Sequence, residues 1–169
     1  MSAARGFTLL EVLVAVVIVA VLAGAVGVGM AGLGGSRQLH NEAERLQHHL
    51  EYACETAQLD GHALGLRLRP DGYLFVRRDG DRWRALVEQP AMAAHSLPAG
   101  TQLVVSRDGE RLAVPAAGAS SAAPQLVCFS SGDLTPFRAE LTRSGAGERF
   151  TLVGHADGRL TLESADDPR

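Results

Sequence analysis

The chain has 169 residues and a formal net charge of −3, which indicates one domain with a modest core and no strong basic field for binding nucleic acid. All 16 basic residues are arginines, and two cysteines, Cys54 and Cys128, are too few for a disulfide scaffold or a zinc site. Hydrophobicity is uneven along the chain, because residues 12–35 contain no charge while the remainder is typical of a soluble domain.

Residues 12–35 form an apolar run of 24 positions, and about 20 apolar residues suffice for a helix to cross a bilayer. An ordinary single-span anchor explains this run but not the residues before it. A cleaved secretory signal is a second interpretation, with Arg5 as its basic region and Ala23-Gly24-Ala25 as its cleavage site. Glu11 opposes it, because an ionisable group inside a membrane segment is costly and usually has a function and a partner.

The glycines of the run also match the dinucleotide-binding pattern G-x-G-x-x-G. Gly27, Gly29 and Gly32 supply the glycines, and Glu51 lies where the ribose-binding acid is expected. That acid should end a second strand, whereas Glu51 lies inside a long helical pattern, and no alternation of strands and helices follows. We therefore interpret these glycines as part of a membrane helix.

The octapeptide Arg5-Gly6-Phe7-Thr8-Leu9-Leu10-Glu11-Val12 leads into the apolar run. It resembles the class III signal of type IV pilins and pseudopilins. The resemblance implies that a prepilin peptidase cleaves after Gly6, removes a leader of residues 1–6 and methylates the new N-terminal residue, Phe7. It also implies that Glu11 is the glutamate found at the fifth position of the mature chains.

The position of Glu11 has a physical rationale as well. Cleavage leaves a positive amine on Phe7, and a carboxylate is favoured near a helix N-terminus. An unpaired charge in lipid is costly, so Glu11 should pair with an amine. The resemblance implies that this amine can belong to a neighbouring subunit during assembly. The simpler alternative is that Glu11 pairs with the N-terminus of its own chain.

Glycines crowd the end of the apolar run, and each costs a helix interior about 1 kcal/mol relative to alanine. We expect a bent or partly melted segment there, or alternatively small-residue packing against another membrane helix. The sequence thus predicts that residues 7–35 form the transmembrane half of an N-terminal helix.

Residues 36–61 have the pattern of an amphipathic helix, which Ser36 can cap and Asp60-Gly61 can end. Its apolar residues recur at spacings of three and four: Leu39, Ala43, Leu46, Leu50, Ala53 and Ala57. His40, His48 and His49 also lie on it. The last two point about 100° apart on a helix, so we predict that the histidines lie on its solvated surface and bind no metal.

From residue 63 the period of hydrophobicity changes to two, which is typical of strands. Strands are predicted over 64–69, 73–77, 83–87, 102–106, 111–114, 126–129, 137–142, 150–153 and 160–162. Asp108-Gly109 and Asp157-Gly158 are expected hairpin turns. Residues 88–100 and 115–124 are predicted loops, and the acidic tail 163–169 is predicted to be frayed. Residues 62–169 are therefore expected to form a domain of antiparallel sheets.

No catalytic pattern accompanies these strands. Ser120, Ser121, Ser130 and Ser131 lie in loop-like stretches with no histidine base implied nearby. The sequence contains no G-x-S-x-G, H-E-x-x-H or Walker pattern, and its Asp-Gly pairs lie outside any D-x-D-x-D-G calcium loop. We expect no enzymatic activity, no cofactor and no metal.

The motifs of the predicted β domain resemble the H-type minor pseudopilin family, GspH, of the type II secretion system. The similar stretches are Gly65-Leu66-Arg67, D-G-Y-L-F over 71–75, D-G-D-R-W-R-A-L over 79–86 and F-S-S-G-D-L-T-P-F over 129–137. The resemblance covers nearly the whole chain, with Ala85 standing where a proline is common. Related minor pilins of type IV pili share this domain.

The resemblance implies an α+β fold of the type IV pilin kind, with a long N-terminal helix, its first half transmembrane, packed on antiparallel β-sheets. The implied function is structural: a minor pseudopilin near the pseudopilus tip that supports export of folded proteins across the outer membrane. The implied partners are other pseudopilins, the prepilin peptidase and the bacterial inner membrane, which the chain would cross once with its C-terminal domain in the periplasm.

The alternative function is that of a minor pilin of a type IV pilus that binds DNA during uptake. DNA binding requires a basic exposed patch. Without Arg5 the mature chain has 15 arginines against 19 acidic residues, a net charge of −4, so no nucleic-acid partner is expected.

The two cysteines would both lie outside the cytoplasm. Cys54 neighbours the apolar helix face, and Cys128 alternates with Leu126 on one strand face. A bond between them would close a loop of about 75 residues, worth about 4 kcal/mol in the chain-entropy model. Two buried free thiols that act as small hydrophobic residues are the alternative.

Overall fold

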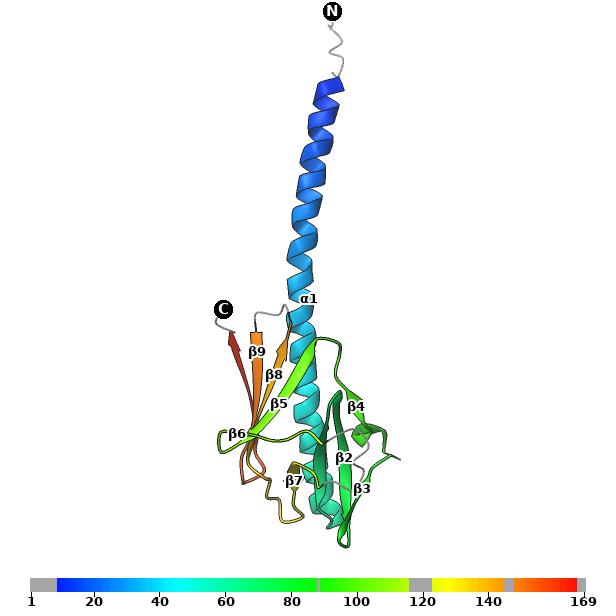
Figure 1. Cartoon of the computed structure of the whole chain (residues 1–169), viewed down its shortest axis with the longest axis vertical. Helices are drawn as coiled ribbons and strands as arrows, with labels where there is room; N and C mark the ends of the chain where they lie inside the picture. Colours follow the sequence, from blue (N-terminus) through cyan, green and yellow to red (C-terminus); the bar gives the residue numbers. More distant parts are fainter. Residues whose placement is uncertain (1–8, 88, 116–122, 145–147, 167–169) are drawn as a thin grey trace, which may run out of the picture.

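The computed structural model describes residues 9–87, 89–115, 123–144 and 148–166, apart from the side chains of 22–34 and 166. Within these residues one long helix is followed by two antiparallel sheets (Figure 1). The predicted α+β architecture is confirmed. Gly6 and Phe7, the residues of the predicted cleavage site, lie outside the described residues.

Helix α1 runs without interruption from Leu9 to Asp60, a length of about 78 Å at 1.5 Å per residue. Its N-terminal part projects away from the strands, and its C-terminal part lies alongside them (Figure 1). The expected melted segment near the glycines is therefore wrong, and Ser36 lies inside the helix rather than at a cap. A helix propagates cooperatively from the turns on either side, so penalties of about 1 kcal/mol per glycine do not end it.

The second half of α1 has the predicted apolar face. Exposed fractions are 2% or less for all six residues of that face: Leu39, Ala43, Leu46, Leu50, Ala53 and Ala57. Leu59, on another face, is 79% exposed. The helix ends at Asp60, and Gly61 follows with a φ of 68°, the left-handed conformation that glycine adopts most easily after a helix. The predicted face and end of the amphipathic helix are confirmed.

The first sheet has the strand order β3-β2-β1-β7. The strands predicted over 64–69, 73–77 and 83–87 are confirmed as a three-stranded meander of β1 (Leu64–Arg69), β2 (Gly72–Asp79) and β3 (Arg82–Ala85). Strand β7 (Leu126–Cys128) pairs with β1. The region predicted as one long loop contains the 3-10 helix η1 (Pro90–Met92) and β4 (His95–Ser96), which pairs with β2. Met92 is fully buried, so its burial attaches this connection to the core, which the loop prediction missed.

The second sheet has the strand order β10-β9-β8-β5-β6. Its strands are β5 (Thr101–Arg107), β6 (Glu110–Arg111), β8 (Phe137–Arg143), β9 (Glu148–Gly154) and β10 (Leu160–Asp166). Asp108 and Gly109 have φ angles of 52° and 81°, as a tight hairpin turn requires. Most of the predicted loop 115–124 lies outside the described residues, because 116–122 are not among them.

The acidic tail is ordered further than predicted. Strand β10 continues to Asp166, whose partner in β9 is Glu148, and Glu163 lies opposite Thr151. Backbone pairing does not depend on side-chain charge, and acidic side chains on an edge strand point into solvent. The expectation of fraying is therefore wrong for 163–166, and residues 167–169 lie outside the description.

Both sheets bury one face against the same stretch of α1. The helix contacts β1 and β7 of the first sheet and β8, β9 and β10 of the second. The buried side chains of the helix and of both sheets form a single apolar cluster. The core thus belongs to the second half of the helix, and the first half extends beyond it (Figure 1).

Candidate functional site

The N-terminal end of α1 is the first part of the predicted site. Glu11 lies in the first turn of the helix, where the helix dipole favours a carboxylate. The large apolar side chains from Leu9 to Val21 are 46% to 86% exposed. A continuous apolar surface of this kind requires a covering by lipid or protein.

Among the residues that the structure describes, no helix is both long and apolar enough to cross a membrane. The side chains of 22–34, which make up much of the predicted transmembrane half, lie outside that description.

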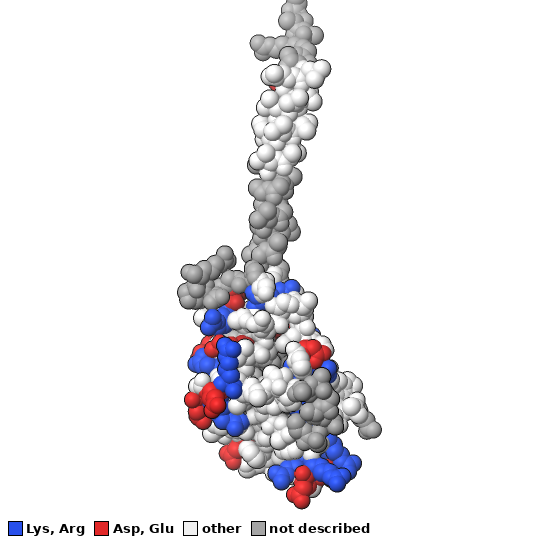
Figure 2. Space-filling model, in the orientation of Figure 1, with Lys and Arg blue, Asp and Glu red and all other residues white. Residues whose placement is uncertain are grey.

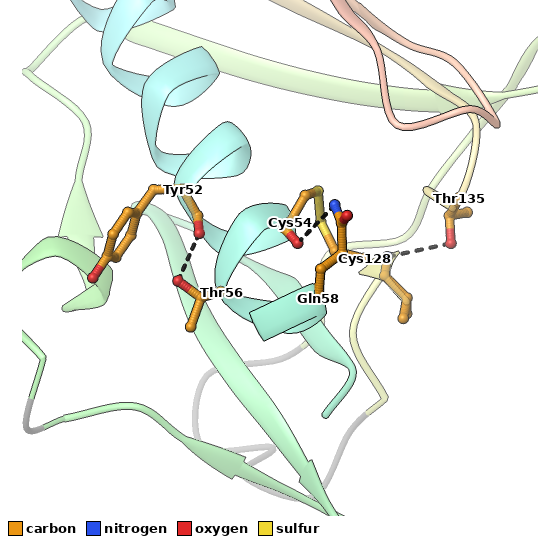
Figure 3. The surroundings of a disulfide bond; sticks show 7 residues. Tyr52, Cys54, Thr56, Gln58, Cys128 and Thr135 are labelled. Carbon is orange, nitrogen blue, oxygen red and sulfur yellow. Dashed lines mark hydrogen bonds between the residues drawn. A yellow bond between two sulfur atoms is a disulfide. The ribbon is translucent and has the colours of Figure 1, made fainter. Parts of the chain in front are cut away.

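A disulfide joins Cys54 of α1 to Cys128 of β7 (Figure 3). Their Cα atoms are 4.9 Å apart, although the residues are separated by 74 positions in the sequence. Both cysteines are buried, and Gln58 Nε2 donates a hydrogen bond to the carbonyl oxygen of Cys54 at 3.4 Å (Figure 3). Because Cys128 also pairs with Leu64 of β1, the disulfide fixes the C-terminal half of the helix to the first sheet.

The F-S-S-G-D-L-T-P-F stretch over 129–137 forms the connection from the first sheet to the second. Phe129 N donates to the Asp133 carbonyl at 2.8 Å, and Ser131 Oγ donates to Asp133 Oδ2 at 2.7 Å. Val127 N donates to Thr135 Oγ1 at 3.2 Å, and Thr135 N donates to the Val127 carbonyl at 2.9 Å. Backbone hydrogen bonds, the contact between the Ser131 and Asp133 side chains and the bond from Val127 N to the Thr135 hydroxyl therefore hold the shape of this connection.

A polar cluster that the sequence did not predict lies between α1 and the first sheet. His95 Nε2 of β4 lies 2.7 Å from Glu42 Oε2 of α1, with side chains 18% and 10% exposed. Tyr73 of β2 hydrogen-bonds through its hydroxyl to His49 Nδ1 at 3.2 Å. The first contact fastens β4 to the helix and the second fastens β2 to it.

The interpretation of His49 as solvated helix surface is wrong. Its ring lies within 6.3 Å, between ring centroids, of the rings of Tyr73, Phe75 and His95. Burial lowers the pKa of His49 below its usual value, with smaller contributions from His95 and Arg45. Burial also raises the pKa of Tyr73 far above its usual value. The partners of His49 are at least 24 positions away in sequence, so helical periodicity alone could not identify them.

Across the described ranges, no group of three or more His, Cys, Asp or Glu side chains is arranged to hold a metal ion. The observed arrangement consists of a long helix with an exposed apolar N-terminal part, a β domain on its second half, and side-chain contacts that stabilise this domain. This is the organisation of a pilin-like protein.

Two family models match the chain. The prokaryotic N-terminal methylation motif matches residues 1–27, and the type II transport protein GspH matches residues 42–158. The chain belongs to the GspH family. It is thus a minor pseudopilin, a structural protein of the type II secretion system and not an enzyme.

Individual relatives agree with this assignment. The chain is 36% identical over 166 residues to the type II secretion system protein H of Pseudomonas aeruginosa, with 95% of each chain covered. It is 31% identical over 168 residues to the protein of the same name from Aeromonas hydrophila, covering 93% of this chain and 92% of that one. The structure of the minor pseudopilin EpsH from the Vibrio cholerae type 2 secretion system has the same fold, with a TM-score of 0.61 at 24% identity, covering 75% and 97% of the two chains.

Replacement of both Cys54 and Cys128 by alanine should lower the free energy of unfolding by about 4 kcal/mol, because the unfolded chain regains the freedom of the loop that the disulfide closes. Urea unfolding of residues 36–169 measures the change. Dithiothreitol should bring the unmodified fragment close to the stability of the double variant and leave the variant unchanged. Equal stability of the unmodified fragment with and without reductant would contradict the structural role of this bond.

His49→Gln should flatten the dependence of stability on pH in the window that begins near the usual histidine pKa of about 6.5 and extends below it. The folded-state pKa of His49 lies below its unfolded value of about 6.5, so the unfolded state binds more protons and stability falls as pH drops through this window. Thermal unfolding of the 36–169 fragment at several pH values measures the slope. His48→Gln is the matched control, because the neighbouring His48 side chain is 73% exposed. An unchanged slope in His49→Gln would show that this histidine does not couple stability to pH.

Proposed function

We propose that this minor pseudopilin lies near the tip of the pseudopilus, together with other pseudopilins, and supports export of folded proteins across the outer membrane. The main support for this proposal is that one chain combines an N-terminal methylation motif with a GspH domain. An N-terminal methylation motif covers residues 1–27, a GspH domain covers 42–158, and one uninterrupted helix joins them. A continuous helix of this length connects an anchoring segment to a domain that can pack in a filament.

In this proposal residues 7–35 anchor the chain, crossing the inner membrane once and leaving the C-terminal domain in the periplasm. The exposed apolar side chains from Leu9 to Val21 support an anchoring role. The Cys54–Cys128 disulfide supports a periplasmic location of the domain, because disulfides form and persist in the oxidising periplasm rather than in the cytosol.

The same proposal assigns roles to the residues of the signal. A prepilin peptidase cleaves between Gly6 and Phe7 and methylates Phe7, and the methylation motif over residues 1–27 supports this step. Glu11 then pairs with the N-terminal amine of a neighbouring pseudopilin during assembly. Its place in the first helical turn, among exposed apolar side chains, supports this role because a carboxylate in such surroundings gains most from a positive partner.

The N-terminus of the protein purified from membranes should be N-methylated Phe7. Mass spectrometry of the N-terminal peptide tests this directly. Gly6→Val should leave the leader of residues 1–6 attached, because the resemblance to the peptidase signal depends mainly on this glycine. A mature chain that begins at Val26 would instead indicate an ordinary secretory signal.

Glu11→Leu should give a processed, membrane-bound protein that crosslinks poorly to other pseudopilins and secretes substrate inefficiently. The substitution increases apolarity and keeps the cleavage junction, so only pairing with a neighbour's amine is lost. Glu55→Leu, which removes an exposed carboxylate from the other half of α1, serves as the control. Crosslinking and secretion at the unmodified level in Glu11→Leu would leave pairing of Glu11 with its own N-terminus as its role.

A further inference from the structure

The hairpin formed by β2 and β3 carries an exposed group of basic side chains. Arg77 and Arg78 lie on β2, Arg82 and Arg84 lie on β3, and all four are exposed. Four of the 16 arginines of the chain thus fall within eight residues, against only two acidic residues there, whereas the whole chain has a net charge of −3. Basic side chains gather at the end of the domain opposite the projecting part of α1 (Figure 2).

Ion pairs within the hairpin neutralise only part of the positive charge of these four arginines. The register places Arg77 directly opposite Arg84, and like charges at such positions are unfavourable. Arg84 Nε lies 3.0 Å from Asp79 Oδ2, and an Arg78 nitrogen lies 4.0 Å from Asp81.

Among the described residues, which leave out Glu88, Arg77 and Arg82 have no ion pair within 4.0 Å. Their guanidinium groups are therefore placed to receive carboxylates, which arginine binds in a bidentate geometry.

Strand β3 also presents a backbone edge. It lies at the end of the strand order. On β2, Arg78 N donates to Ala63 on the β1 side, whereas Phe75 O accepts from Leu86 on the β3 side. Alternation along antiparallel strands then directs the backbone groups of Arg84 toward β2 and those of Trp83 and Ala85 toward the open edge. Such an edge is a template for a further strand.

The surface beside the outer edge of β3 can accommodate a side chain of a bound peptide. A hollow of about 260 Å³ adjoins β3, and Val87 on its wall is 81% exposed. The hollow is lined by Arg77, Arg84, Ala85, Leu86, Val87 and Gln89. It therefore combines two guanidinium groups with apolar surface next to the outer edge of β3.

We propose that the β2–β3 hairpin is a docking surface for an extended, carboxylate-rich segment of another protein. The segment adds to β3 through backbone hydrogen bonds and places carboxylates against Arg77, Arg82 and Arg84. A nucleic-acid strand fits less well, because it cannot continue the backbone ladder of β3 and because Asp79 and Asp81 repel phosphates between the arginines. The inference depends on the hairpin alone and not on the place of the chain in the filament.

The test uses the full chain in detergent micelles and a fluorescent decapeptide of alternating threonine and glutamate as the probe. Arg77→Gln/Arg84→Gln should weaken binding by about tenfold or more, because charge-assisted hydrogen bonds to two guanidinium groups are lost. Arg138→Gln/Arg159→Gln removes two exposed arginines outside the hairpin, 50% and 67% exposed, and should bind as the unmodified chain does. Arg82→Gln alone should weaken binding by a smaller factor.

Two probe controls separate charge from backbone recognition. A decapeptide with glutamine in place of glutamate tests the carboxylates, and the acidic peptide with N-methylated alternate amides tests the β3 edge; both should bind much more weakly than the probe. Absence of probe binding, equal loss in both double variants, or equal binding of the glutamine peptide would overturn the proposal. Duplex DNA that binds more tightly than the peptide, and is released by Arg77→Gln/Arg84→Gln, would also overturn it in favour of a phosphate-binding surface.

Discussion

The apolar face of α1 between Leu39 and Ala57 is the surface on which both sheets depend. Each antiparallel sheet has one face that requires burial, and the chain passes between the two sheets three times, from β4 to β5, from β6 to β7 and from β7 to β8. The helix satisfies both of them at once, since it contacts β1 and β7 on one side and β8 to β10 on the other. Loss of this face would leave two sheets without a common core, which explains why its residues are almost completely buried.

A disulfide and a set of polar side-chain contacts supplement this packing, and both join the helix to strands that are distant in sequence. The disulfide holds β7 to the helix near its C-terminal end. The contact between Glu42 and His95 and the hydrogen bond between His49 and Tyr73 hold β4 and β2 to its middle. Buried polar groups are favourable only when they have partners, so this cluster specifies how the β4 connection lies as well as adding to stability.

A continuous helix has consequences for a filament subunit. All backbone hydrogen bonds of a helix are internal, so the same element can extend from the β domain into an apolar environment without leaving polar backbone groups unpaired. The orientation of the β domain relative to the first half of α1 is therefore fixed only to the extent that the helix is rigid. Two exposed regions among the described residues differ in chemistry: the first half of the helix carries apolar side chains, and the β2–β3 hairpin carries arginines and a strand edge.

The sequence by itself determined the elements whose signals are local. Spacings of three and four residues placed the buried face of α1, the glycine after Asp60 marked its end, and alternation with Asp-Gly turns located most of the strands. The order of the motifs also indicated the pseudopilin family. The helix, turn and strand signals each arise within a window of a few residues, so no knowledge of the rest of the chain is needed to interpret them, whereas the family resemblance depends on the order of motifs along the chain.

Only the tertiary structure decided the features that join distant segments. The sequence left the cysteines open between a bond and two free thiols, and their Cα separation of 4.9 Å across 74 positions arises from the packing of β7 against α1. His49 has the pattern of an exposed helix residue, yet Tyr73 and His95 cover it. The glycines of α1 and the acidic end of β10 have unfavourable local propensities, but cooperative helix propagation and pairing with β9 override them. A propensity of about 1 kcal/mol per residue is small beside the cooperative backbone hydrogen bonding of the element in which the residue lies.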